Sequence, residues 1–420
     1  MDKRTFLKQS AAIAAGIPLI TSGIHELNQF FQGVSAEKLA ETEEYWLQIR
    51  QLYRLKPDYI NLENGYYNFI PEPTLNKYMD HVREVNYQGS HYMRTVQFEN
   101  KDKAAHKLAA LLDCGEDELI ITRNTTESLD TVINGYDWRA GDEAVMAEQD
   151  YGSMLNQFKL MAARHGIVNK MVNVPLHPTS DNEIVDVYER AITEKTRLLM
   201  VCHMINITGQ ILPIQKIAEM AHSYNVDVMV DGAHAVGHFD FSLRNLGCDY
   251  YGSSLHKWLS VPLGAGILYV RKEKVKDLWP TFAAWNNNAE DIRKLNQTGT
   301  HPVHTDLTIQ DAIEFYLSIG KDRKEARLRF LQQYWTEPLR DIKGIVLNTP
   351  ADAKRACGIA NVGVSNMKPS DLAKTLMDTY KIFTVPIEGQ GVFGCRITPN
   401  IYTTTEELDA FIKAIKEIAA

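Results

Sequence analysis

Short apolar runs alternate with helical patterns between about residues 103 and 266. The runs are nearly continuous in Val, Ile, Leu, Met and Ala, which is typical of strands buried on both faces of a mostly parallel sheet. We predict strands at 119–122, 143–147, 198–202, 226–230 and 265–270, with helices at 126–135, 153–165, 186–194 and 214–224. This alternation predicts an α/β fold with an open, mostly parallel central sheet.

The pattern differs on either side of this region. Upstream, residues 37–54 predict an amphipathic helix and residues 60–65 a short strand ending in a turn, before a helix opened by Pro71 and Pro73. The elements predicted downstream are one long charged helix over 309–339, strands at 344–347 and 359–364, and helices at 369–381 and after Thr405. Without strict alternation, these elements indicate a smaller α+β domain.

These changes of pattern divide the chain into four parts. They are an N-terminal segment over 1–36, a helix and strand over 37–62 that pack with the small domain, a large domain over 63–308 and a C-terminal small domain over 309–420. The sequence shows no internal repeat and no Gly/Ser-rich linker, so we expect the two domains to pack closely.

The composition is that of a folded protein of enzyme size. The 420 residues are 45% hydrophobic and 9% aromatic, which excludes a disordered chain. The net charge of −8 argues against a nucleic-acid-binding protein, which would show a basic excess. The five cysteines form no CxxC pair, and His301 and His304 have no third ligand nearby in sequence, so no metal site is predicted.

The first 36 residues resemble an export signal. Lys3 and Arg4 open the run Lys-Arg-Thr-Phe-Leu-Lys, and no charge follows from Gln9 to Ile24. The apolar part is too short for a membrane span, which needs about 20 residues. The run resembles a twin-arginine signal with Lys in place of the first Arg, and implies a periplasmic or exported protein. The alternative is a helix docked on the body of a cytoplasmic protein. Cleavage is expected at Val34–Ala36 or at Ile20–Gly23.

Two motifs at the end of the predicted sheet carry the candidate chemistry. Asp-Gly-Ala-His-Ala-Val-Gly-His runs from Asp231 to His238, and Ser-Leu-His-Lys follows at Ser254–Lys257. Open α/β sheets bind ligands at the carboxyl ends of their strands. A lysine that forms a Schiff base and a carboxylate that keeps the ring nitrogen protonated are what pyridoxal 5′-phosphate (PLP) requires.

These motifs, with the Gly-Ala-Gly that begins at Gly264, resemble the class V aminotransferase family, which includes cysteine desulfurases, kynureninases and isopenicillin N epimerases. The resemblance extends from about Asn61 to the C-terminus and implies a fold-type I PLP-dependent transferase with PLP in the large domain. It also implies an amino-acid or peptide-like substrate and a homodimer.

The resemblance assigns catalytic roles to three residues. Lys257 is expected to carry the Schiff base and to move the proton at the substrate α-carbon. Asp231 is expected to pair with the pyridine nitrogen, and His234 to lie close to the ring and its phenolic oxygen. Asn206, in Ile-Asn-Ile-Thr-Gly, matches the family asparagine that binds the same oxygen.

The remaining assignments concern the phosphate, the ring face and the substrate. Thr125 and Thr126, at a helix start, are expected to bind the phosphate. The other residues assigned are Ser254 and His256 at the phosphate, Thr300 closing the partner subunit's site, Tyr151 or else Gln149 stacking on the ring, and Arg396, Asn64 and Gly65 at the substrate, with Arg94 as a weaker candidate for a distal carboxylate. An arginine suits this task because its planar guanidinium binds a carboxylate in bidentate fashion.

The reaction itself is left open among several outcomes. Residues 382–393 contain no cysteine, and Cys395 directly adjoins Arg396, which disfavours desulfurase chemistry through an enzyme persulfide. Transamination, epimerisation, and C–S or C–C bond cleavage are compatible with a lysine base. The overall motif set is closest to isopenicillin N epimerase-like proteins. A binding protein that keeps the fold without catalysis is the alternative of another class.

Overall fold

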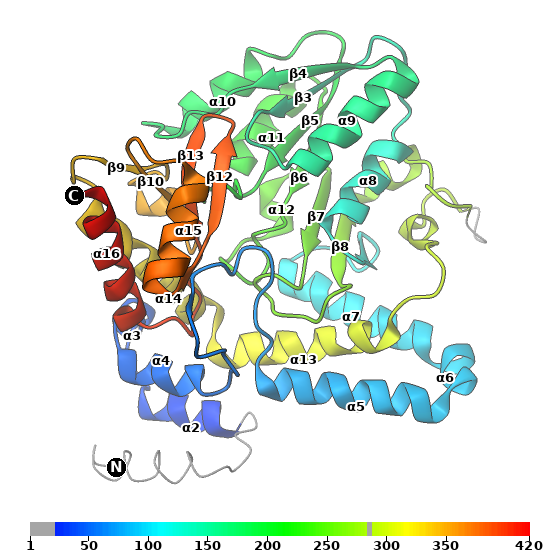
Figure 1. The fold of residues 1–420 in the computed structure, drawn as a ribbon. Coiled ribbons are helices and arrows are strands. Elements are labelled where there is room, and N and C mark those ends of the chain that lie inside the picture. Colours follow the sequence, from blue (N-terminus) through cyan, green and yellow to red (C-terminus); the bar gives the residue numbers. More distant parts are fainter. Residues whose placement is uncertain (1–21, 284–287) are drawn as a thin grey trace.

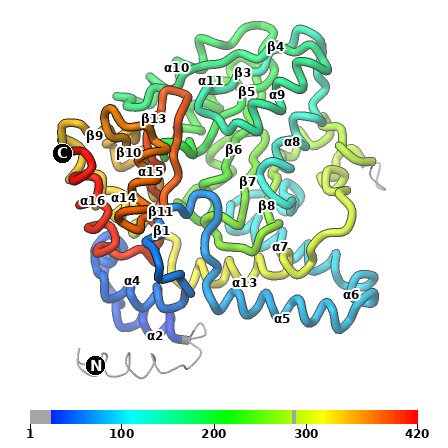
Figure 2. Tube along the Cα trace, viewed as in Figure 1, coloured from blue at the N-terminus to red at the C-terminus, as the bar shows by residue number. Residues whose placement is uncertain are grey.

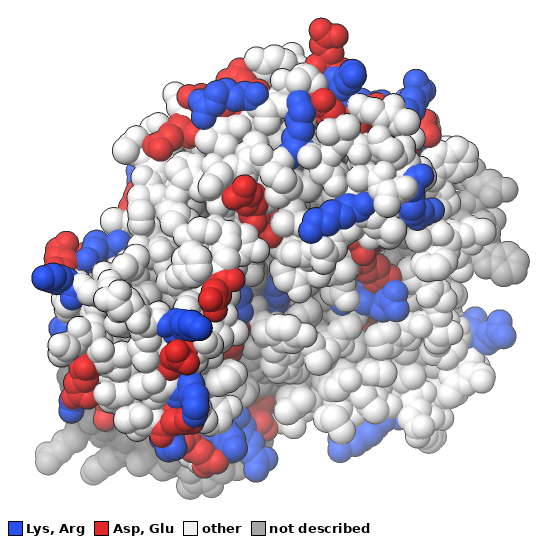
Figure 3. All heavy atoms as spheres, turned by 45° about the horizontal axis from the view of Figure 1, so that its top comes forward, with Lys and Arg blue, Asp and Glu red and all other residues white. Residues whose placement is uncertain are grey.

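The computed structural model describes residues 22–283 and 288–420 (Figure 1). The run from Lys3 to Lys8, on which the export prediction depends, lies outside these residues. No helix among the described residues is long and apolar enough to cross a bilayer. On the face drawn in Figure 3, acidic and basic side chains are interspersed.

The central sheet has seven strands in the order β2-β8-β7-β6-β5-β3-β4. Their bounds are β2 Leu119–Thr122, β3 Glu143–Ala147, β4 Val168–Val172, β5 Thr196–Cys202, β6 Asp227–Asp231, β7 Tyr250–Ser254 and β8 Gly266–Val270. Strands β4, β3, β5, β6 and β7 pair in parallel, whereas β8 is antiparallel to β7 and to β2. The predicted mostly parallel α/β sheet is therefore confirmed.

Helices cover both faces of this sheet. The helices of this part of the chain are α5 Glu72–Gln88, α6 Ser90–Thr95, α7 Gln97–Leu112, α8 Thr125–Gly135, α9 Gly152–His165, α10 Asp181–Glu189, α11 Ile214–Ser223 and α12 Leu243–Leu246, of which α5 packs on α13 rather than on the sheet. Along β5, Leu199 and Val201 enter one apolar cluster with α7 and α11, whereas Leu198 and Met200 enter the other with α8 and α9. Side chains alternate between the faces of a strand, and here both faces are dry, which explains the unbroken apolar runs.

The C-terminal part forms a second sheet in the order β12-β13-β10-β9, with all pairs antiparallel. The elements are α13 Val303–Ile319, α14 Lys321–Thr336, β9 Ile345–Leu347, β10 Ala360–Val364, α15 Pro369–Tyr380, β11 Ile382–Phe383, β12 Val385–Gly389, β13 Val392–Ile397 and α16 Thr405–Ala419. The single helix predicted over 309–339 is wrong, because Gly320, at φ +104°, ends α13 and α14 begins after it. L side chains rarely adopt that φ.

The N-terminal elements are α2 Ser22–Phe30, α3 Ala36–Ala40, α4 Glu43–Arg50 and β1 Ile60–Asn61. The helix predicted over 37–54 is thus two short helices. Strand β1 pairs in parallel with β11, and Figure 2 shows them side by side. The Arg50 guanidinium forms an ion pair with Glu407 of α16 at 2.7 Å. This part of the chain therefore lies against the C-terminal elements.

Arg327 of α14 connects the two ends of the chain. Its guanidinium is fully buried, donates to the carbonyls of Ala40 at 2.8 Å and Thr403 at 3.0 Å, and lies 2.5 Å from the Glu43 carboxylate. Burying a charged guanidinium is unfavourable unless acceptors surround it, so Arg327 depends on these contacts.

We predict that Arg327→Ala lowers the free energy of unfolding by about 3–5 kcal/mol, because it removes the cation that pairs with Glu43 and leaves two carbonyls without their donor. Urea unfolding followed by far-UV circular dichroism measures the change. Lys413→Ala is the control, because Lys413 pairs with Glu417 on the exposed face of α16, and such pairs contribute about 1 kcal/mol or less. Equal midpoints for the two variants would contradict the prediction.

Candidate active site

A cavity of about 390 Å³ lies where β5, β6 and β7 end, beside the start of α8. Most residues assigned from the sequence line it: Gly65, Thr125, Thr126, Tyr151, Asn206, Asp231, His234, Ser254, His256, Lys257 and Arg396. Cys202 is opposite Asp231, and Asp231 opposite Gly252, in the register of the parallel strands. The three strands therefore deliver their C-terminal residues to one edge.

Asp231 ends β6 as a buried carboxylate. Its Oδ1 accepts the Ala233 N–H at 3.0 Å. Burial raises the pKa of this carboxyl, while the Ala233 N–H and the Lys257 amine act to lower it. A carboxylate in this setting is a strong acceptor for a protonated nitrogen placed beside it.

Lys257 follows β7 and points its amine at His234. Nζ lies 3.1 Å from His234 Nε2. Burial lowers the pKa of Lys257 to about 8, against the attraction of Asp231. Burial and the adjacent Lys257 lower the pKa of His234 well below its usual value. The His234 imidazole is therefore neutral, and Lys257 has far more neutral amine near neutral pH than an ordinary lysine, which is the form that a nucleophilic or basic lysine needs.

The opposite end of the cavity suits an anion. Helix α8 begins at Thr125, and the side chain of its N-cap Asn124 accepts the Glu127 N–H at 2.9 Å. The Thr125 N–H and hydroxyl both contact Ser254 Oγ, at 2.9 and 2.7 Å. Free N–H groups and the helix dipole attract phosphate at such an end.

His256 borders the same cavity. Its Nδ1 is buried with no hydrogen-bond partner. Burial, assisted by Lys257, lowers the pKa of His256 to about 4. A neutral imidazole with an unused nitrogen is free to exchange a hydrogen bond with a ligand.

Arg396, on β13 of the C-terminal sheet, also lines the cavity. Its Nη2 and Nε contact the Glu63 carboxylate at 2.6 and 3.2 Å, and Nη1 donates to the Asn206 carbonyl at 3.3 Å. A Cβ on Gly65 would lie 2.8 Å from Arg396 Cζ, so the glycine lets the loop pass against the guanidinium. Glu63 was not predicted as a site residue. The signal for it in the sequence was its position directly before Asn64, which was assigned to the substrate.

Asn64 is placed differently from its assignment. Its fully buried amide donates to the Thr398 carbonyl at 2.7 Å and accepts from the Tyr402 hydroxyl at 2.7 Å. It does not line the cavity. The residue instead ties the loop that carries Glu63 and Gly65 to the end of β13.

The two candidates for the ring face are separated by the structure. Tyr151 lines the cavity and is 45% exposed. Gln149 is buried, with Oε1 accepting the Val174 N–H at 3.0 Å and Nε2 donating to Asn173 Oδ1 at 2.7 Å. An aromatic side chain is therefore the one available at this wall.

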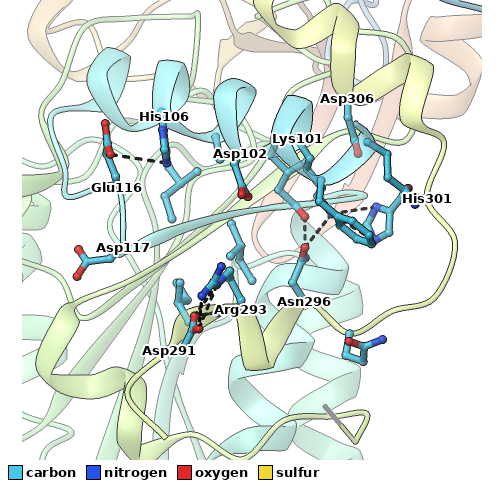
Figure 4. A pocket seen from close by; sticks show the side chains of 18 of the residues that line it. Lys101, Asp102, His106, Glu116, Asp117, Asp291, Arg293, Asn296, His301 and Asp306 are labelled. Atoms are coloured by element: carbon cyan, nitrogen blue, oxygen red, sulfur yellow. Dashed lines mark hydrogen bonds and ion pairs between the residues drawn. The ribbon is translucent and has the colours of Figure 1, made fainter. Parts of the chain in front are cut away.

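Thr300 lies outside this cavity. It lines a second one of about 860 Å³, shown in Figure 4, between α7 and the segment preceding α13. There Lys101 donates to Asn296 Oδ1 at 2.7 Å, and the buried Asp306 carboxylate has no hydrogen-bond partner. The assignment of Thr300 to a partner's site stays a prediction, as does the role of Arg94.

Two further residues near the lysine were not predicted. Cys202 lines the cavity, but burial raises the pKa of its thiol well above its usual value. Trp258, fully buried, donates its indole N–H to His234 Nδ1 at 3.3 Å. Trp258 directly follows Lys257, but only the fold shows that its ring turns back to His234.

Comparison with known proteins shows which protein family has this sequence and fold. The family model described as aminotransferase class-V matches residues 70–411. Isopenicillin N epimerase of Streptomyces clavuligerus is 25% identical, with 88% of this chain and 97% of that protein covered. A cysteine desulfurase of Klebsiella pneumoniae is 25% identical, with 79% and 86% covered. The structure of C-DES with glycine covalently linked to its PLP cofactor matches with a TM-score of 0.77 at 20% identity, with 87% and 98% covered.

The residues of the cavity fit PLP. Lys257, whose pKa burial lowers, matches the aldehyde of this cofactor. The buried carboxylate of Asp231 at a strand end matches the ring nitrogen, and the helix N-terminus lined by hydroxyls matches the phosphate. The unused Nδ1 of His256 adds a group with no partner in the protein itself. Together with the family match over more than half of the chain, this fit shows that the protein belongs to the aminotransferase class-V family of PLP-dependent enzymes.

Proposed function

We propose that the protein acts at the α-carbon of an amino-acid or peptide-like substrate, in the manner of isopenicillin N epimerase-like proteins. The supporting observation is that Lys257, Asp231 and Arg396 converge on one cavity from two domains. A base, a carboxylate for the ring nitrogen and a cation for the substrate carboxylate are the groups that this chemistry requires.

The cofactor would be held at three points. Asp231 would keep the ring nitrogen protonated, and Asn206 and His234 would hold the phenolic oxygen. The start of α8 would bind the phosphate through N–H groups and the hydroxyls of Thr125, Thr126 and Ser254, with His256 beside them. Bound PLP supplies an electron-accepting ring that takes up the charge left when a bond to the α-carbon breaks.

Lys257 would link to the cofactor and then act as the base at the α-carbon. Its pKa of about 8 suits this role, because it leaves far more amine unprotonated near neutral pH than an ordinary lysine has. Arg396 would bind the substrate carboxylate. Glu63 holds the Nε–Nη2 edge of Arg396 and the Asn206 carbonyl accepts from Nη1, so the substrate carboxylate would take the remaining N–H groups of Nη1 and Nη2.

Epimerisation also needs a proton donor on the second face of the ring. Tyr151 is the exposed phenol in the cavity wall and would serve there, either by donating a proton or by admitting water.

A second candidate is a C–S lyase, supported by the desulfurase relative. A desulfurase that forms a persulfide on its own cysteine is less well supported. Cys395 is buried on β13 and donates to the Pro369 carbonyl, and burial raises the pKa of its thiol to about 11. Burial likewise suppresses the thiolate of Cys202, and the thiolate is the form that attacks sulfur.

We predict that purified protein reduced with borohydride carries the cofactor on Lys257, as detected by peptide mass spectrometry. Lys257→Ala should lose the label. Lys294→Met is the matched control, because Lys294 is buried with a pKa lowered by desolvation but does not line the cavity. Label on Lys294, or label retained in Lys257→Ala, would refute the assignment.

Incubation with isopenicillin N and a panel of amino acids including L-cysteine, in deuterated water, separates the reactions. We expect deuterium at the α-carbon and mixed chirality without keto acid, and at least about 100-fold slower exchange in Lys257→Ala. Pyruvate with ammonia and sulfide would indicate the lyase instead. A keto acid with aminated cofactor would indicate transamination, and PLP-loaded protein that changes none of these compounds would support a non-catalytic binding protein.

We also propose that the protein is exported in folded form, on the basis of the Lys3–Lys8 run. Helix α2 supports cleavage near Ile20–Gly23 rather than at Val34–Ala36, because Asn28 donates to the Ser318 carbonyl at 2.8 Å and Leu27 is buried. Mass spectrometry of periplasmic protein should therefore find an N-terminus close to Ser22. An intact Met1 on protein confined to the cytosol would contradict export.

A further inference from the structure

His234 lies between a lysine and a tryptophan. Its Nε2 is 3.1 Å from Lys257 Nζ, and its Nδ1 accepts the Trp258 indole N–H at 3.3 Å. The imidazole is 3% exposed and the indole fully buried, so water does not compete for either nitrogen. The two contacts together determine where the imidazole proton sits.

An indole N–H can only donate a hydrogen bond. The Nδ1 of His234 must therefore present its lone pair to Trp258. A neutral imidazole carries one N–H, which is then on Nε2. The doubly protonated ring is disfavoured, because burial, Lys257 and Arg396 all lower the pKa of His234.

The Nε2–H points at Lys257 Nζ. That contact is a hydrogen bond only if Nζ offers a lone pair, because an ammonium has three donors and no acceptor. An ammonium would place N–H against N–H in a buried setting. The tautomer selected by Trp258 therefore favours the amine form of Lys257.

Trp258 is held in place by its own neighbours. Its ring stacks on His238 with centroids 3.7 Å apart and planes 22° apart, and the Lys324 amine donates to its carbonyl. His238 accepts the Gly358 N–H at Nε2 and, through Nδ1, donates to the His234 carbonyl at 2.8 Å. The indole cannot rotate away from His234 without breaking this packing.

Other charged groups also act on Lys257. Desolvation is the largest influence and lowers its pKa. The groups around it are Asp231, Glu63 and Cys202, which favour the ammonium, and Arg396, which opposes it, with His256 on the neighbouring position. None of these groups selects a tautomer of His234. The hydrogen bond from Trp258 therefore acts on the protonation of Lys257 separately, and it can be tested separately.

We propose that Trp258 is a positioning residue: its indole N–H fixes His234 in the Nε2–H tautomer, and this tautomer favours the uncharged amine of Lys257 over its ammonium form. The inference rests on the proposed function in that Lys257 is taken as the cofactor-linking lysine. It extends that function because the protonation state of Lys257 then depends on a residue that does not line the cavity.

The test is trace labelling of the cofactor-free protein with acetic anhydride across a pH series, read by peptide mass spectrometry with exposed Lys413 as internal standard. Wild-type Lys257 should reach half-maximal reactivity near pH 8. In Trp258→Phe the imidazole can move its proton to Nδ1 and accept from an ammonium. The midpoint should then rise by at least about one pH unit, which is about five-fold less reactive amine at pH 8.

Three comparisons make the result specific. Trp138→Phe removes another buried indole N–H, which donates to the Ile133 carbonyl at 2.8 Å and does not line the cavity, and it should leave the midpoint unchanged. Trp258→Phe in a His234→Ala background should cause no further shift. Replacement of Trp258 by β-(3-benzothienyl)alanine keeps the ring size and removes only the N–H, so it serves if the Phe variant does not fold.

An unchanged or lowered midpoint in the folded Trp258 variants overturns the proposal. So does an equal shift in Trp138→Phe, or a shift that persists without His234. Borohydride labelling of the same wild-type preparation after PLP addition tests the proposed function separately. If PLP fails to attach to Lys257, that function fails, whereas the midpoint in cofactor-free protein still decides the role of Trp258.

Discussion

The parallel pairing of β5, β6 and β7 is the constraint on which the site depends. Parallel strands end at the same edge, and their register sets Cys202 beside Asp231 and Asp231 beside Gly252. Lys257 follows at the turn after β7. A carboxylate and an amine separated by 26 positions in the chain are thereby brought to one buried cavity, where desolvation alters the protonation of both.

The C-terminal sheet adds Arg396 to this site, together with the residues that hold its guanidinium in place. Arg396 comes from β13, and the loop before α5 contributes Glu63 and Gly65. Asn64 ties that loop to Thr398 at the end of the same strand. The guanidinium and the loop against which it lies are therefore anchored to one another, and the two domains present their groups from opposite sides of the cavity.

Much of the large domain could be predicted, because strands buried on both faces have unbroken apolar sequences. Strand β4 was missed because it is at the sheet edge, where Val168 and Met171 are exposed and Lys170 pairs with Glu143. Strand β7 was missed because its Tyr-Tyr-Gly-Ser-Ser sequence reads as a turn, although all five residues are buried. The buried hydroxyl of Ser253 donates a hydrogen bond to the Gly232 carbonyl. The sequence cannot reveal that such a partner is present.

The sequence by itself determined the family motifs: an aspartate at a strand end, a histidine three residues later and a lysine after the next strand. Those spacings are local and are set by the chain. Only the tertiary structure decided which side chains face the cavity, so that Tyr151 is in its wall while Gln149 and Asn64 are committed to protein hydrogen bonds. It alone brings Glu63 to Arg396 and the Trp258 indole to His234. Hydrogen-bond direction depends on the position of both partners in space, and no spacing along the chain contains that information.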